Sequence, residues 1–374
     1  MGDPKTSLRY VIADRRRATD YEELTLHSQW SPYNFAKQGW FNLTNDGRAP
    51  WDDNSTRLRC VTVSKPESWW YSSSKVKDKP VVDRRLDNGV EEAAVESQSG
   101  WYAYRDPGKQ WFRPYVEQQA TQESMIEEAT KGALRLGLYR NVSGTWLSFL
   151  SRYFAAYRYP EYGIFMALSY AQREALSDVV AGPILFQAVD KERHAQAIAL
   201  HCMELEKAVE GFSDAAAKDV WMDDPVYQPV RRYVEQLLAC RDWAEILFAV
   251  NLSFEPLVGR LFTNYLIARQ GCACGDPVTP IIAETAEADR QRSLASAAEL
   301  ARFVIANVPD NKGVIEGWLA YWLPQARAAA AGLSVLAQHP QEGSADFQAT
   351  LETITTEHGR LLSELGLHVS EASL

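Results

Sequence analysis

The sequence is poor in cysteine, and it shows no long basic run and no apolar run long enough to span a membrane. Its five cysteines are an odd, scattered set, which is typical of a reducing compartment rather than of a disulfide framework. The formal net charge of −10 argues against a nucleic-acid or anionic-membrane partner. We find no apolar run of about 18 residues and no apolar signal-peptide core at the start. The sequence therefore predicts a cytoplasmic protein that contacts neither nucleic acid nor membrane.

Common catalytic motifs are also missing. The chain has no glycine-rich phosphate loop, no Gly-x-Ser-x-Gly elbow and no cysteine-protease signature. Cys272 and Cys274 are spaced too tightly for a usual zinc site and have no second pair. These patterns supply no catalytic and no cofactor-binding residue.

Aromatic residues are plentiful, with 12 Trp and 17 Tyr. Many fall in residues 1–115, which are rich in turn-forming residues and contain a polar insertion at about 65–100. An irregular segment of this kind cannot bury all its aromatic side chains against itself. We predict an extended N-terminal arm that lies on the surface of a partner. The alternatives are an arm that lies on its own bundle, or a core that is simply rich in aromatics.

Helical periodicity begins near residue 116 and continues to about 335, and no stretch alternates convincingly at the strand period. This pattern predicts an all-α bundle with four long core helices, followed by a C-terminal helix and tail at 336–374. The apolar run at 223–272 is predicted to be helical, with a kink or break at Pro256. Other expected helices cover residues 121–138, 143–157, 279–307, 311–332 and 346–365.

The central stretch, residues 161–205, carries two apolar stripes at helical spacing on either side of a break at residues 181–183 (Ala-Gly-Pro). Two such stripes predict an antiparallel helix pair that buries one face. Glu161, Lys191 and His194 fall on the predicted inner faces.

The histidines lack the spacing of a carboxylate-bridged di-iron site. Such a site takes one Glu from each of two helices and a Glu-x-x-His pair from each of two others. The chain contains no Glu-x-x-His pair, because none of the residues three before a histidine is a carboxylate. These residues are Leu24, Lys191, Ile198, Leu336, Thr355 and Leu365.

Residues 190–194 (DKERH) nevertheless resemble the Asp-Glu-x-Arg-His motif that catalytic subunits of di-iron hydrocarbon monooxygenases carry twice, with Lys in place of the ligand Glu. Residues 287–291 (EADRQ) resemble a weaker second copy. Near Glu161, a lysine at this position can form a buried ion pair in place of a metal. The alternative is that these are ordinary polar residues on solvated faces. The resemblance implies a degenerate ligand set of Glu161, Lys191, His194, Glu255, Ala288 and Gln291.

Further motifs, in their order along the chain, resemble the β (small hydroxylase) subunit of the soluble bacterial multicomponent di-iron monooxygenases. These enzymes oxidise methane, propane, alkenes, toluene or phenol. Residues 65–100 depart from the family's patterns. The matching segments are residues 17–25 (RATDYEELT), 105–107 (RDP), 114–116 (PYV), 161–163 (EYG), 173–178 (REALSD), 223–225 (DDP), 241–243 (RDW) and 314–318 (VIEGW), with Trp111, Trp322 and Pro324.

The resemblance implies a ferritin-like helical bundle that has lost its metal site and holds no cofactor. In that family the β chain scaffolds an α subunit, whose di-iron centre activates O₂ and oxidises a hydrocarbon. The expected complex pairs two αβ protomers and includes a small γ subunit. A coupling protein and an NAD(P)H-dependent reductase with FAD and a 2Fe–2S cluster bind transiently. A short-chain alkane or alkene is favoured over an aromatic substrate.

Two other functions stay open at this point. The chain could be a stand-alone ferritin-like oxidase with an atypical metal or radical centre on Glu161, His194 and Glu255. It could also be a free-standing helical interaction protein. The missing Glu-x-x-His pairs count against the first alternative, and the ordered motifs count against the second.

Overall fold

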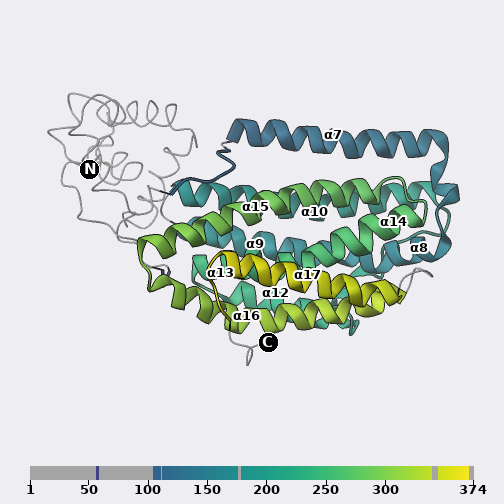
Figure 1. Cartoon of the computed structure of the whole chain (residues 1–374). Coiled ribbons are helices and arrows are strands. Elements are labelled where there is room, and N and C mark those ends of the chain that lie inside the picture. The colour runs from purple at the N-terminus through teal and green to yellow at the C-terminus, as the bar shows by residue number, and fades with distance from the viewer. Residues whose placement is uncertain (1–55, 59–103, 111, 176–177, 339–343, 370–374) are drawn as a thin grey trace, which may run out of the picture.

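The computed structural model describes residues 56–58, 104–110, 112–175, 178–338 and 344–369, and every regular element in these ranges is a helix (Figure 1). The predicted all-α class is confirmed. The predicted insertion at 65–100 and most of the predicted arm lie outside the described residues. The helices are α7 (Phe112–Leu136), η4 (Leu138–Asn141), α8 (Gly144–Phe149), η5 (Leu150–Phe154), α9 (Arg158–Glu174), α10 (Asp178–Ala208), α11 (Ala217–Asp223), α12 (Gln228–Ala239), α13 (Trp243–Ala249), η6 (Val250–Gly259), η7 (Leu261–Arg269), α14 (Gln270–Ala273), α15 (Thr279–Asn307), α16 (Asn311–Gly332), η8 (Leu333–Gln338) and α17 (Ser344–Glu364).

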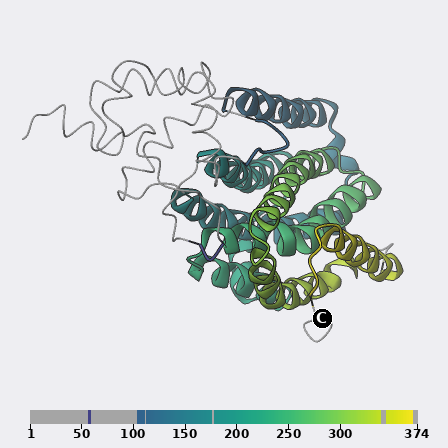
Figure 2. The ribbon, with the colours of Figure 1, turned by 60° about the vertical axis from the view of Figure 1, so that its left-hand side comes forward.

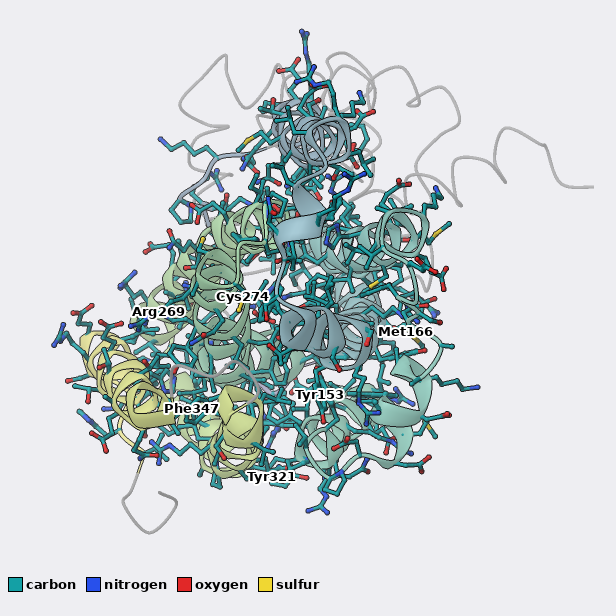
Figure 3. All side chains as sticks on the ribbon, turned by 90° about the vertical axis from the view of Figure 1, so that its right-hand side faces the viewer. Tyr153, Met166, Arg269, Cys274, Tyr321 and Phe347 are labelled. Carbon is teal, nitrogen blue, oxygen red and sulfur yellow. The ribbon has the colours of Figure 1, made fainter. Side chains whose placement is uncertain are left out.

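Four long helices form the centre of the bundle. They are α9, α10, α15 and the continuous helix at 243–273 that contains α13, η6, η7 and α14. α9 packs along α10, α10 along α15, α15 along η6 and η7, and α13 returns to α9. α12, α16 and α17 cover one side of this group, and α7 lies on the opposite side, as Figures 2 and 3 show. Aromatic residues fill the interior, and Trp146, Trp243, Trp318 and Trp322 are all fully buried.

The turn between α9 and α10 comes earlier in the chain than predicted. α9 ends at Glu174, and Ala175 has extended backbone with ψ 108°. α10 begins at Asp178 and runs through Gly182 and Pro183 without a break. A proline in a helix removes one backbone hydrogen bond. Here the burial of the surrounding turn outweighs that local preference, because tertiary packing routinely overrides propensity.

The apolar run at 223–272 is divided, but not at Pro256. Cys240 has extended backbone that ends α12, and Asp242 caps α13. From Trp243 the helix is continuous to Ala273. Within it, η6 and η7 have π-helical rather than α-helical hydrogen bonding. The changed bonding pattern accommodates a residue that has no N–H, so the helix passes Pro256 without ending.

The helix at 243–273 corrects the prediction that no apolar run is long enough to span a membrane. By length and composition it is apolar enough to span a membrane. However, 89% of its most apolar window is buried inside the bundle. This burial is the environment of a core helix, since its apolar surface is already covered by protein.

Several other helix boundaries follow the sequence closely. α15 and α16 begin and end at the predicted residues 279–307 and 311–332. α17 differs from the predicted 346–365 by one or two residues at each end. α7 starts at Phe112 rather than near 121, and the predicted helix at 143–157 consists of α8 followed by the π-helical turn η5. The helix signals are therefore strongest in the second half of the chain.

Asp242→Ala is expected to destabilise the protein by about 1–2 kcal/mol. The Asp242 carboxylate accepts hydrogen bonds from the backbone N–H groups of Ala244 and Glu245 at the start of α13. Asp310 occupies the same position before α16 but makes no such bond, so Asp310→Ala is the matched control. Urea unfolding followed by circular dichroism measures both changes, and equal losses would contradict the capping role.

Candidate functional site

Four of the predicted residues meet in the middle of the bundle. Glu161 lies in the first turn of α9, Lys191 and His194 lie on α10, and Glu255 lies on η6. The three-residue spacing turns Lys191 and His194 to one face of α10. No member of this group is more than 7% exposed. The alternative that these are polar residues on solvated faces is therefore wrong.

The Lys191 ammonium lies between two carboxylates. Its Nζ is 2.7 Å from Glu255 Oε1 and 3.1 Å from Glu161 Oε2. Burial by itself disfavours the charged amine, but the two carboxylates outweigh burial and raise the pKa of Lys191. Burial likewise disfavours the Glu161 carboxylate, but Lys191 and His194 together outweigh burial, so the pKa of Glu161 is lowered. The expected ion pair between Lys191 and Glu161 is present, and Glu255 is its second partner.

His194 connects this ion pair to α15. Its Nδ1 is 3.4 Å from Glu161 Oε2, and its Nε2 is 3.3 Å from Asp289 Oδ2. Burial lowers the pKa of an imidazole, but the contacts with Asp289 and Glu161 more than compensate and raise the pKa of His194 to about 9. At neutral pH the ring is therefore an imidazolium with a carboxylate beside each nitrogen.

A second layer of polar contacts surrounds His194 and includes residues that the sequence did not single out. Arg292 forms ion pairs with both Asp190 and Asp289. The Tyr115 hydroxyl donates a 2.8 Å hydrogen bond to Asp190, and the Gln119 amide donates a 2.9 Å bond to Asp289. Burial and the neighbouring Asp289 raise the pKa of Asp190 to about 6. This layer joins α7 to α10 and α15.

The remaining predicted positions, Ala288 and Gln291, are not part of the cluster. Both are exposed on the outer side of α15. Asp289 and Ala286 face inward instead, because they are three residues apart and share a helix face. Ala286 lies with Glu161 and His194 around a small cavity. The positions predicted from the second motif, Ala288 and Gln291, are therefore wrong. The pair on α15 that faces the cluster is Ala286 and Asp289, two residues earlier in the chain.

These side chains do not fit a di-iron centre. The Lys191 ammonium already contacts the carboxylates of Glu161 and Glu255, so a metal cation there would meet a fixed positive charge. His194 is protonated and has no free lone pair, and Ala286 offers no ligand atom. Within the described part of the chain, no group of three or more His, Cys, Asp and Glu side chains is arranged to hold a metal ion.

Comparison with known proteins places the chain in a family. Residues 91–307, more than half of the chain, match the model of the methane/phenol/alkene hydroxylase family. The chain is 29% identical over 364 residues to the propane 2-monooxygenase hydroxylase component small subunit of Rhodococcus jostii RHA1, covering 96% of this chain and 89% of that one. It is 28% identical over 340 residues to the methane monooxygenase component A beta chain of Methylococcus capsulatus, covering 87% and 78% respectively.

Two solved structures share the fold. Phenol hydroxylase from Pseudomonas sp. OX1 aligns with a TM-score of 0.64 and 21% identity, covering 72% of this chain and 79% of that one. Toluene 4-monooxygenase with toluene in its resting active site aligns with a TM-score of 0.61 and 23% identity, covering 79% and 96%.

Fold and site together define a helical bundle whose central polar positions hold an ion-pair cluster. The chain belongs to the methane/phenol/alkene hydroxylase family. Within it, the chain is a small, or β, hydroxylase subunit of the di-iron monooxygenases, as the sequence motifs predicted.

Lys191→Met is expected to lower the free energy of unfolding by about 3–5 kcal/mol, because it leaves Glu255 buried without a counter-charge and leaves Glu161 with His194 as its cationic partner. Lys131 offers a matched exposed control, since it also pairs with two glutamates, Glu127 and Glu128. Lys131→Met should cost less than about 1 kcal/mol. Denaturant unfolding of both variants checks the expectation, and similar losses would show that burial of the cluster is unimportant.

Stability is also expected to fall as the pH rises from 6.5 to 9. The pKa of His194 is raised from 6.5 to about 9 in the folded state, so its contribution is complete below 6.5 and is lost as pH rises through 9. The expected slope is about 1.4 kcal/mol per pH unit.

Unfolding free energies measured across this range should flatten in His194→Gln. His358→Gln is the control, because burial lowers the pKa of His358 to about 4 and the ring is neutral throughout the range. An unchanged slope in His194→Gln would refute the assignment.

Proposed function

We propose that this chain is the non-catalytic β subunit that scaffolds an iron-bearing α subunit in the hydroxylase component of a di-iron hydrocarbon monooxygenase. The observation that carries the proposal is the Lys191 ammonium, which contacts both Glu161 and Glu255 at the centre of the bundle. Ferritin-like proteins that bind two metal ions place ligands at such inward positions. In this chain the same positions hold the helices together through charge.

The proposed complex contains two αβ protomers and a small γ subunit. A coupling protein and a reductase with FAD and a 2Fe–2S cluster deliver electrons from NAD(P)H to the α subunit, which uses O₂. The proposal follows from the family resemblance, and the relatives' names support it, since they denote small or beta chains of hydroxylase components. The assembly is proposed to work in the cytoplasm.

A short-chain alkane or alkene is the proposed class of substrate. Relatives named for propane or methane oxidation include some at 28–29% identity over most of this chain. Relatives named for toluene and phenol oxidation include two that are 24% and 25% identical over shorter lengths. An aromatic substrate is the second possibility, and the proposed substrate cavity lies in the α subunit.

The iron content of the purified chain tests the proposal. We expect no iron in the chain expressed alone, and iron in the complex when the α subunit is co-expressed, as measured by elemental analysis with each subunit quantified. Lys191→Glu is the control for a single missing ligand, and it should not restore metal binding because Ala286 still supplies no ligand. About two irons per isolated chain would instead identify this polypeptide as the oxidase, which was the alternative function.

A further inference from the structure

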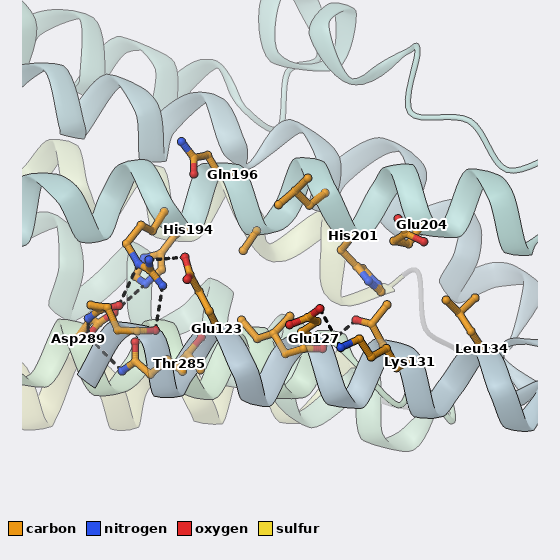
Figure 4. A pocket seen from close by; sticks show the side chains of 17 residues that line it. Glu123, Glu127, Lys131, Leu134, His194, Gln196, His201, Glu204, Thr285 and Asp289 are labelled. Atoms are coloured by element: carbon orange, nitrogen blue, oxygen red, sulfur yellow. Dashed lines mark hydrogen bonds and ion pairs between the residues drawn. The ribbon is translucent and has the colours of Figure 1, made fainter. Parts of the chain in front are cut away.

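A pocket of about 510 Å³ lies between α7 and α10, beside the ion-pair cluster (Figure 4). Its volume is within the range of about 300–1,000 Å³ that is typical of small-molecule sites. One end reaches His194 and Asp289, and the other end lies about two turns further along α10. The apolar side chains of Ile126 and Leu134 on α7 face those of Ala197 and Leu200 on α10.

The attachment of α7 explains why the pocket exists. At the start of α7, the Tyr115 and Gln119 side chains bond to Asp190 and Asp289 in the bundle. At its end, the left-handed backbone of Gly137 turns the chain into η4. Polar contacts hold the first turns of the helix, and the turn fixes its end. The middle of α7 therefore stands away from α10, and Figure 4 shows the pocket between them.

His201 is a buried polar residue in the lining of the pocket. Its side chain projects from α10 towards α7 (Figure 4), and the residue is 3% exposed. The ring packs near the rings of Tyr139 and Phe154. Neither ring nitrogen has a hydrogen-bond partner among the described residues. A buried polar group without a hydrogen-bond partner is energetically unfavourable, and such groups often mark a bound molecule or an ion.

The charges around the pocket are already paired with one another. Glu127 pairs with Lys131, Glu123 with Arg193, and Glu204 with Lys207. His201 itself is neutral, because burial lowers its pKa to about 4 despite the nearby carboxylates of Asp276 and Glu204. A neutral imidazole has one N–H donor and one acceptor nitrogen. The His201 imidazole is therefore uncharged, and it can both donate and accept a hydrogen bond.

We propose that this pocket binds a small neutral molecule with an apolar body and one hydroxyl group, an alcohol or a phenol, whose hydroxyl bonds to His201. The hydrocarbon body lies against the apolar side chains of the pocket, and the hydroxyl group supplies the hydrogen-bond partner that the His201 imidazole lacks. Binding rests on the pocket alone. Only its biological meaning depends on the proposed function, since hydroxylation of a hydrocarbon produces molecules of this class.

The probe for the test is 4-bromophenol, because its bromine can be located by anomalous X-ray scattering. In crystals of this chain with its co-expressed large subunit, we expect bromine in the pocket and the phenol oxygen at hydrogen-bond distance from His201. With the full-length chain, titration calorimetry should show that 4-bromotoluene, which lacks the hydroxyl, binds roughly tenfold more weakly.

Two pairs of variants test the site itself. His201→Phe keeps an aromatic ring but removes both nitrogens, and should weaken 4-bromophenol roughly three- to tenfold. His358→Phe alters another buried neutral histidine, outside the pocket, and should leave binding unchanged. Ala197→Phe fills the pocket and should abolish binding, whereas Ala199→Phe alters a half-exposed residue that does not line it.

Several outcomes would overturn the proposal. They are bromine found only elsewhere, a polypeptide segment of the large subunit or ordered solvent alone beside His201, or equal affinity for 4-bromophenol and 4-bromotoluene. None of these results bears on iron content, so failure of the pocket and failure of the proposed scaffold function are distinguishable.

Discussion

The ion pair that Lys191 forms with Glu161 and Glu255 is the interaction on which the centre of the bundle depends. It joins α10 to α9 and to the apolar helix at 243–273, and His194 extends the contact to Asp289 on α15. One connected set of charges therefore touches all four core helices. Removing charges from water costs several kcal/mol per ion, and the attraction offsets that cost only while every partner is present.

The apolar helix at 243–273 places the charged side chain of Glu255 in the core. All residues of η6 are buried, and Glu255 directly precedes Pro256 within it. Gly259, one turn later, leaves room for the carboxylate, since a side-chain carbon there would collide with Glu255 Oε2. The π-helical hydrogen bonding, the proline and the glycine thus all lie around the position that faces Lys191. Irregular helical turns of this kind occur frequently at functional sites.

The two buried histidines of α10, His194 and His201, differ in charge. On the inner side, His194 and Lys191 are both protonated, because carboxylates surround them. Two turns along α10, His201 is equally buried but neutral, because aromatic rings rather than carboxylates contact it. The same residue type therefore acts as a structural cation at one position and as an uncharged hydrogen-bonding group at the other. Local partners, rather than burial, account for the difference.

The sequence by itself determined the all-α class, the bounds of α15 and α16, the family, and the grouping of Glu161, Lys191, His194 and Glu255. Helical periodicity and short motifs are properties of local segments, so they can be recognised in a single sequence. Only the tertiary structure decided that Asp289 rather than Gln291 faces the cluster, that the chain passes Pro256 and Pro183 in helical form, and that α7 leaves a pocket above His201. The rotation of a helix about its axis and the distance to its neighbour are set by packing between distant segments, which a local pattern does not contain.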